Sequence, residues 1–129
     1  MATIKKFEEI KAWQLARELT RHIYEATKHE GFKVDYGLRN QIQRASVSIL
    51  SNIAEGFERG GNKEFVNFLS IAKGSCGEVR AQIYVALDQG YISQGAFDQL
   101  FVLCNRISAM LYSFISSIKE SSVKGIRYK

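Results

Sequence analysis

Residues 93–118 read SQGAFDQLFVLCNRISAMLYSFISSI, and their apolar side chains recur at alternating intervals of three and four. Such spacing predicts one face of a long helix, and the alternation favours near-parallel packing against other helices. Apolar residues also recur at helical spacing over about 9–28, 36–56 and 62–90. Four helices with short connections predict an all-α protein, an antiparallel up-down four-helix bundle. The stripe of the last segment comprises Phe97, Leu100, Cys104, Ile107, Leu111, Phe114 and Ile118.

The residues between the segments are typical of helix ends. Seven of the ten glycines lie between the segments or at their ends, and the chain has no proline to interrupt a helix. Asn62 and Ser93 have side chains that cap helix N-termini, and Gly90 suits the left-handed position after a helix. Gly74 and Gly77 instead fall inside the third segment, where each costs about 1 kcal/mol relative to alanine. We therefore expect another helix to approach closely at that level.

Length and composition are those of a single soluble domain. The chain has 129 residues, of which 46% are hydrophobic and 24% charged. We predict one domain over 1–120 and a basic flexible tail over 121–129, where the apolar pattern is lost. No secretory signal is evident, no apolar run approaches the roughly 20 residues of a membrane span, and two cysteines are too few for a disulfide scaffold. We expect a cytoplasmic protein without a membrane partner.

The segment 93–118 is more apolar than one core-facing stripe requires. Fifteen of its 26 residues are apolar, and only Asp98 and Arg106 are charged. A surface helix of a monomeric bundle needs one apolar face, so the additional apolar residues indicate self-association. The predicted oligomer interface comprises Phe101, Val102, Leu103, Met110, Tyr112 and Ile115.

A polar stripe runs beside the apolar stripes of the second and third segments. If the two helices are antiparallel, Arg44 falls near Ser75 and Glu78. We predict a semi-buried Arg44–Glu78 pair that fixes the helix register or a subunit contact, with a polar ligand site as the functional alternative. The complete stripe comprises Gln41, Arg44, Ser48, Asn52, Glu55, Ser75 and Glu78.

No set of residues in the sequence is typical of catalysis or metal binding. His22 and His29 are seven residues apart, about 10 Å along a helix, which is too far for both to bind one metal ion. Cys76 and Cys104 occupy core positions and are expected to be buried and reduced. Residues 56–63, GFERGGNK, only partly match a phosphate-binding loop and follow a helix instead of a strand. We therefore predict a protein that is not an enzyme and needs no cofactor.

The net charge of +5 and the isoelectric point near 9.3 permit a nucleic-acid partner. In an oligomer each basic patch is repeated, and repetition converts weak phosphate affinity into avidity for RNA or DNA. The alternative is that these residues form solvated helix faces or complement helix dipoles. The candidate nucleic-acid-binding residues are Arg17, Arg21, Lys28, Lys119, Lys124, Arg127 and Lys129.

Three stretches follow, in order, the pattern of a known family: FEEIKAW (7–13), YGLRNQIQRASVSILSNIAEG (36–56) and EFVNFLSIAKGSCGE (64–78). The chain resembles the four-helix-bundle proteins encoded in intervening sequences of bacterial 23S ribosomal RNA genes. That family is similar to the accessory variability determinant of diversity-generating retroelements. The resemblance implies a ring-like homopentamer and, from the retroelement relatives, a basic surface for nucleic acid and a reverse transcriptase partner. Leu50 departs from the pattern, because family members commonly have proline there.

Two functions from different classes follow from these observations. The first is a non-enzymatic homo-oligomer, a pentamer by the resemblance, that binds nucleic acid through repeated basic patches. The alternative is a protein-binding scaffold or adaptor without affinity for nucleic acid. An enzyme with a site between helices is least supported, because no catalytic set is evident.

Overall fold

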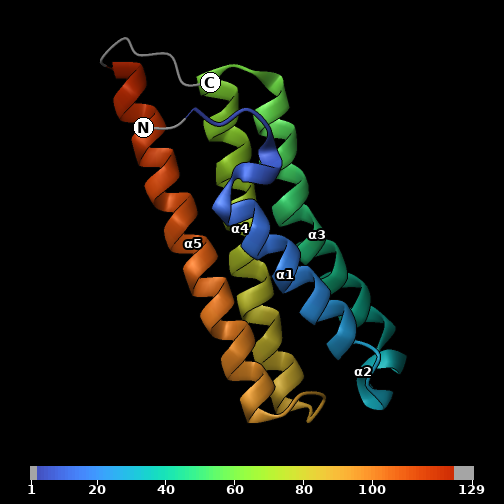
Figure 1. The fold of residues 1–129 in the computed structure, drawn as a ribbon. Helices are drawn as coiled ribbons and strands as arrows, with labels where there is room; N and C mark the ends of the chain where they lie inside the picture. Colours follow the sequence, from blue (N-terminus) through green and yellow to red (C-terminus); the bar gives the residue numbers. More distant parts are fainter. Residues whose placement is uncertain (1–2, 124–129) are drawn as a thin grey trace.

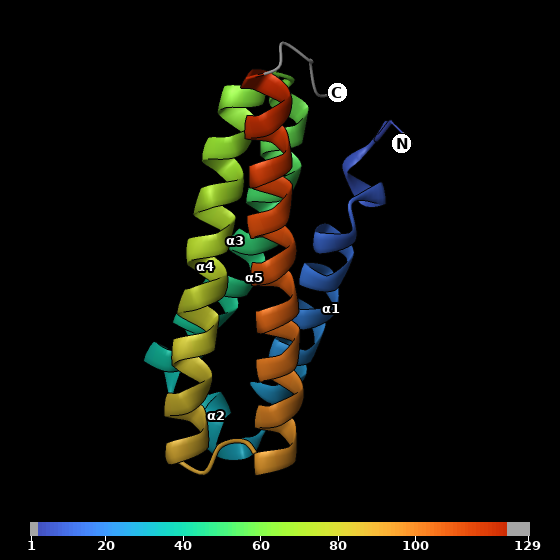
Figure 2. The ribbon, with the colours of Figure 1, turned by 90° about the vertical axis from the view of Figure 1, so that its left-hand side faces the viewer.

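The computed structural model describes residues 3–123, and over that range the chain is helical without any strand. Two elements are short, the 3-10 helix η1 (Phe7–Glu9) and the helix α2 (Glu30–Val34). The long helices alternate in direction, as Figures 1 and 2 show from two sides. The predicted all-α bundle is therefore confirmed. Its long helices are α1 (Lys11–Ala26), α3 (Tyr36–Arg59), α4 (Asn62–Asp88) and α5 (Gln94–Val123).

The core runs along the middle of the bundle, where each long helix contributes its apolar stripe. α1 packs against α3 and α5, and α4 packs against the same two helices (Figure 1). Leu19 of α1, Ile49 of α3, Leu69 of α4 and Leu111 of α5 are completely buried. Burial of one such side chain contributes about 1.5–3 kcal/mol, which explains why four amphipathic segments associate.

The connection between α4 and α5 is fixed by the residues predicted to end and begin these helices. Gly90 has a left-handed φ of 75°, and its amide donates to the carbonyl oxygen three residues earlier at 3.0 Å. The Tyr91 amide donates to the Ala86 carbonyl oxygen at 2.9 Å, which completes a Schellman motif. The Ser93 hydroxyl then accepts a backbone amide of the first turn of α5 at 3.1 Å. The helix end at Gly90 and the N-cap at Ser93 are both confirmed.

The boundary between α3 and α4 differs from the prediction. α3 continues past Gly56 to Arg59 and ends where Gly60 adopts a left-handed φ of 84°. Gly61, with an extended backbone, is the N-cap of α4, and Asn62 is already its first helical residue. The prediction of Asn62 as the N-cap is wrong, since α4 begins without a hydrogen bond from a capping side chain.

The helix α2 is not apparent from the sequence, because five residues are too few to show a period. It places Phe32 in the core, where the ring stacks on Tyr91 with centroids 5.2 Å apart. The Tyr91 hydroxyl donates to an Asp35 carboxylate oxygen at 2.9 Å, and this bond raises the pKa of Tyr91. The other Asp35 oxygen accepts the Leu38 amide at 3.1 Å and caps α3. α2 and the α4–α5 connection thus close one end of the bundle together.

Glycines within the helices have two different environments. A Cβ atom placed on Gly74 or Gly77 would meet no atom of another described helix within 4 Å, so the expected close approach of a helix is wrong. α3 and α4 instead approach closely at Gly56. A Cβ atom there would lie 2.6 Å from the Cβ atom of Phe68. The absence of a side chain at Gly56 lets the two helices come together near their connection.

α5 carries core residues on more than one stripe. Leu103 and Ile115 are only 5% and 9% exposed and belong to the core of the single chain, so their assignment to an oligomer interface is wrong. The core side of α5 is wide because the helix packs against both α1 and α4. Val102 and Tyr112, by contrast, are 55% and 65% exposed.

The C-terminal end of α5 also differs from the prediction. The helix continues to Val123, three residues beyond the predicted domain end at 120. Residues 124–129, the rest of the predicted tail, lie outside the described residues.

By length and composition alone, Gln94–Ser121 of α5 could cross a membrane, because the mean hydropathy over 18 of its residues is 1.4. The same helix supplies a core stripe to the bundle, in which Ile107, Leu111 and Ile118 are completely buried. A helix that contributes to the core of a soluble bundle meets the same criterion. The hydropathy of α5 is therefore weak evidence for a membrane span.

Candidate functional site

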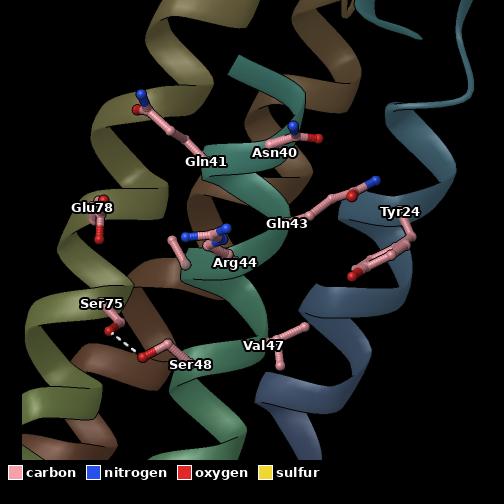
Figure 3. A pocket seen from close by; sticks show the side chains of 10 residues that line it. Tyr24, Asn40, Gln41, Gln43, Arg44, Val47, Ser48, Ser75 and Glu78 are labelled. Atoms are coloured by element: carbon pink, nitrogen blue, oxygen red, sulfur yellow. Dashed lines mark hydrogen bonds between the residues drawn. The ribbon is translucent and has the colours of Figure 1, made fainter. Parts of the chain in front are cut away.

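A polar cavity lies over α3, between α1 and α4 (Figure 3). Its volume is about 830 Å³, within the range of about 300–1,000 Å³ that small-molecule sites occupy. α3 supplies most of the lining, because successive turns of its outer face carry polar side chains. The lining comprises Tyr24 of α1, Asn40, Gln41, Gln43, Arg44, Ala45, Val47 and Ser48 of α3, and Ser75 and Glu78 of α4.

Two members of the predicted polar stripe join α3 to α4 at this cavity. The hydroxyl groups of Ser48 and Ser75 form a hydrogen bond of 2.8 Å (Figure 3). The Asn52 amide donates to both the carbonyl oxygen and the hydroxyl of Ser48, at 2.8 and 2.9 Å. The Ser48 side chain is therefore held both by its own helix and by the neighbouring one.

Arg44 and Glu78 face the cavity from α3 and α4, but the predicted ion pair between them does not form (Figure 3). Within residues 3–123, neither side chain has an oppositely charged group within 4.0 Å. Glu55, another member of the stripe, pairs instead with Arg59 at 2.9 Å. The hydrogen bond between the two serines, and not an ion pair, thus links the helices here.

Gln82 extends the polar network beside the cavity. Its side chain is nearly buried, with its amide nitrogen 3.4 Å from the Gln41 oxygen and 3.5 Å from a Glu78 carboxylate oxygen. The Gln82 amide oxygen is buried and has no hydrogen-bond donor in the described part of the chain. An unpaired buried group of this kind costs about 1–3 kcal/mol.

Arg17, Arg21 and Tyr24 form an exposed stripe on α1, which we call the α1 stripe. They recur at intervals of four and three and so share one face of the helix, and Lys28 follows just past its end. Arg17 and Arg21 make no ion pair within residues 3–123, whereas Lys28 lies 3.7 Å from a Glu25 carboxylate oxygen. Tyr24 also lines the cavity, whereas Arg17 and Arg21 of the α1 stripe are not among its lining residues.

The other predicted basic residues do not join this stripe. Lys119 is exposed in the C-terminal part of α5, which lies at the opposite end of the bundle from α2 (Figure 1). Lys124, Arg127 and Lys129 lie outside the described residues. The predicted nucleic-acid-binding residues that are described thus fall on two separate regions of the surface.

Five residues of the cavity lining were not predicted as site residues from the sequence: Tyr24, Asn40, Gln43, Ala45 and Val47. Asn40, Gln43 and Val47 recur at helical spacing, which is a partial signal for a shared face. That signal does not say which helix lies beside them. The structure places α1 there, and Gln43 donates to the Thr27 hydroxyl at 2.9 Å.

The cysteines are buried, as expected, and pack between α4 and α5. The Cys76 thiol donates to the Cys104 carbonyl oxygen at 3.2 Å. The adjacent Cys76 thiol, together with burial, raises the pKa of the Cys104 thiol and favours its neutral form. In the described range, no group of three or more His, Cys, Asp or Glu residues could hold a metal ion.

Exposed apolar residues gather around the half-buried Phe101 on α4 and α5, and we call Tyr84, Phe101, Val102 and Tyr112 the α4–α5 apolar face. The rings of Tyr84 and Phe101 lie 6.1 Å apart between centroids, and Val102 and Tyr112 are exposed along α5. Met110, also assigned to the oligomer interface, lies elsewhere, in a groove of about 490 Å³ beside the N-terminal segment. The predicted interface residues are thus divided among this face, the groove and the core.

The fold places the protein among small antiparallel four-helix bundles. Within residues 3–123 it has no cluster of side chains that could bind a metal ion. The sequence profile of the 23S rRNA-intervening sequence proteins matches residues 8–113. The chain belongs to that family, which confirms the resemblance seen in the three sequence stretches.

A solved structure shares this fold. It is the crystal structure at 1.70 Å of a protein of unknown function from the S23 ribosomal protein family of Bacteroides thetaiotaomicron. The two chains superpose with a TM-score of 0.74 at 21% identity, over 81% of this chain and 95% of the other. Identity at that level shows the fold alone. None of the curated proteins compared with the chain matches it.

Proposed function

We propose that this protein is a non-enzymatic, homo-oligomeric helical bundle that binds nucleic acid through a basic surface repeated in each subunit. The observation that carries the proposal is the α1 stripe, where Arg17 and Arg21 are exposed without an acidic partner among the described residues. Guanidinium groups in that state can bind phosphate oxygens without first breaking an ion pair. The net charge of +5 favours the same class of partner. The resemblance to the family of 23S rRNA-intervening sequence proteins supports a pentamer as the assembly.

The test compares the wild type with the double variant Arg17→Gln/Arg21→Gln by fluorescence anisotropy of a labelled RNA or DNA. We expect the wild type to bind at low salt, with an affinity that falls as salt rises because counterions are released. The double variant should bind at least about 10-fold more weakly. Its salt dependence should also be shallower, since each lost phosphate contact removes about 0.7–0.9 from the logarithmic slope.

The matched control is Lys5→Gln/Lys63→Gln, which removes the same charge from exposed positions outside α1. Equal losses in the two double variants would show attraction to net charge alone and would reject the α1 stripe as the binding surface. A wild type that binds no nucleic acid at low salt would reject the function itself.

The α4–α5 apolar face supports self-association, and it also favours the second candidate function, a protein-binding scaffold or adaptor. Val102 and Tyr112 are large, exposed and apolar, where a monomeric bundle is usually polar. We propose that the protein is cytoplasmic, has no membrane partner and uses these residues for protein contacts. The two free, buried cysteines agree with a reducing compartment.

Light scattering should therefore give a mass that is a multiple of 14.6 kDa at micromolar concentration. Val102→Glu should shift the protein toward the monomer, because an unpaired charge is strongly disfavoured in an apolar contact. Val34→Glu is the control, since Val34 is 62% exposed but lies in α2. A wild-type mass of 14.6 kDa would refute self-association. The α4–α5 apolar face would then be a contact surface for a different protein.

A further inference from the structure

We infer that Tyr24 is a stacking platform for an unpaired base of a single-stranded nucleic acid that enters the cavity beside the α1 stripe. The inference rests on the proposed nucleic-acid function and adds the class of strand and the residue that contacts it. Tyr24 is 41% exposed and lies at the side of the cavity formed by α1 (Figure 3). Arg21, three residues earlier, shares its helix face.

The ring of Tyr24 is available for a ligand, unlike three of the other four tyrosine rings among residues 3–123. Tyr91 stacks on Phe32, Tyr84 packs against the rings of α5, and Tyr36 lies under the Arg39 guanidinium at 4.9 Å. Tyr24 makes no such ring contact among the described residues, and its hydroxyl has no hydrogen-bond partner there. Every nucleobase has a face that can stack on an exposed aromatic ring of this kind.

The groups around Tyr24 match the other parts of a nucleotide. Arg21 on the α1 stripe and Arg44 in the cavity are cations without an ion pair in the described range, and either can hold a phosphate. The Gln43 amide nitrogen is engaged by Thr27, which leaves its oxygen as an acceptor for a base edge.

The side of the cavity formed by α4 presents acceptors instead of cations. The Glu78 carboxylate lies there, whereas the buried Gln82 side chain lies beside the cavity and is not part of its lining. A carboxylate disfavours phosphate but accepts hydrogen bonds from the amino group of a base. The strand backbone is therefore expected on the side of α1, with base edges directed across α3.

This chemistry favours a single strand over a duplex. Bases within a duplex are already stacked and paired, so a duplex can meet the arginines but cannot place a base face on Tyr24. Arginines alone would bind both forms through phosphate. The preference for unpaired bases is the property that Tyr24 adds.

The experiment measures binding of a short RNA strand of mixed sequence, alone and annealed to its complement, by wild type, Tyr24→Ala, Tyr24→Trp and Tyr112→Ala. We expect Tyr24→Ala to weaken single-strand binding roughly 5- to 150-fold, as for loss of one stacked base. The salt slope should not change, because no charge is removed. Tyr24→Trp should retain the affinity, and duplex binding should be the same in all variants. Tyr112→Ala is the control, an exposed tyrosine on the α4–α5 apolar face.

The outcomes separate this inference from the proposed function. If the wild type binds RNA but Tyr24→Ala binds the single strand as well as the wild type, stacking is overturned and the nucleic-acid function stands. Equal weakening of single-strand and duplex binding by Tyr24→Ala would also overturn it. If the wild type binds neither form at low salt, the proposed function fails first. Unchanged helical circular dichroism and light-scattering mass for Tyr24→Ala show that any loss is not due to misfolding.

Discussion

Phe32→Ala is expected to lower the free energy of unfolding by about 3–5 kcal/mol, although Phe32 lies in a helix of only five residues. The ring is 1% exposed and stacks on Tyr91, so truncation removes apolar burial and leaves a cavity where α2 meets the α4–α5 connection. Tyr91, once released, would also hold Asp35 less firmly at the start of α3. Urea denaturation followed by circular dichroism measures the change.

Val34→Ala provides the control for that measurement. Val34 belongs to the same short helix but is 62% exposed, so its truncation should change stability by no more than about 0.5 kcal/mol. Comparable losses for the two variants would show that α2 as a whole, and not the packing of Phe32, sets the stability of this end. A negligible loss for Phe32→Ala would contradict its place in the core.

The second large effect is a contrast between two glycines of neighbouring helices. Gly56→Ala should destabilise the fold by about 1–3 kcal/mol, because its Cβ atom would overlap Phe68 at 2.6 Å and force α3 away from α4. Gly74→Ala should stabilise it by up to about 1 kcal/mol, because the position is open and alanine favours the helix. Thermal unfolding of both variants measures the difference.

The same substitution is thus expected to have opposite signs at the two positions. Destabilisation by Gly74→Ala in a protein that remains oligomeric would place a second subunit against that part of α4. Stabilisation by Gly56→Ala would show that the close contact of α3 with Phe68 relaxes without loss.

The parts of the fold predicted correctly are those determined by nearby residues. Gly90 and Ser93 form a turn and a cap within a few residues of chain, so their types suffice to predict the geometry. The environment of Gly74 depends on which other helix lies beside it, and the spacing of residues within one helix does not reveal that neighbour. Leu103 is misassigned for a similar reason, since the width of the core side of α5 depends on its two neighbouring helices.

The candidate site could be predicted only in part. Ser48 and Ser75 face one another because α3 and α4 are consecutive and antiparallel, which the short connection already implies. Arg44 and Glu78 both line the cavity but do not form an ion pair. The register of two helices places their residues side by side but does not fix the distance between the charged groups. Tyr24 reaches the cavity only because α1 lies on the other side of α3, an arrangement that spacing along α3 does not specify.

The contact between α1 and α5 has a consequence for synthesis on the ribosome. α3 and α4 can pair as soon as both have emerged, because only a short connection separates them. α1 is translated before α3, α4 and α5, but it meets α5 only after that helix has also left the exit tunnel. Until then the apolar stripe of α1 is not fully covered. Of the four long helices, the first to be translated is therefore among the last to be enclosed, and its apolar stripe is exposed to aggregation or to a chaperone until α5 has emerged.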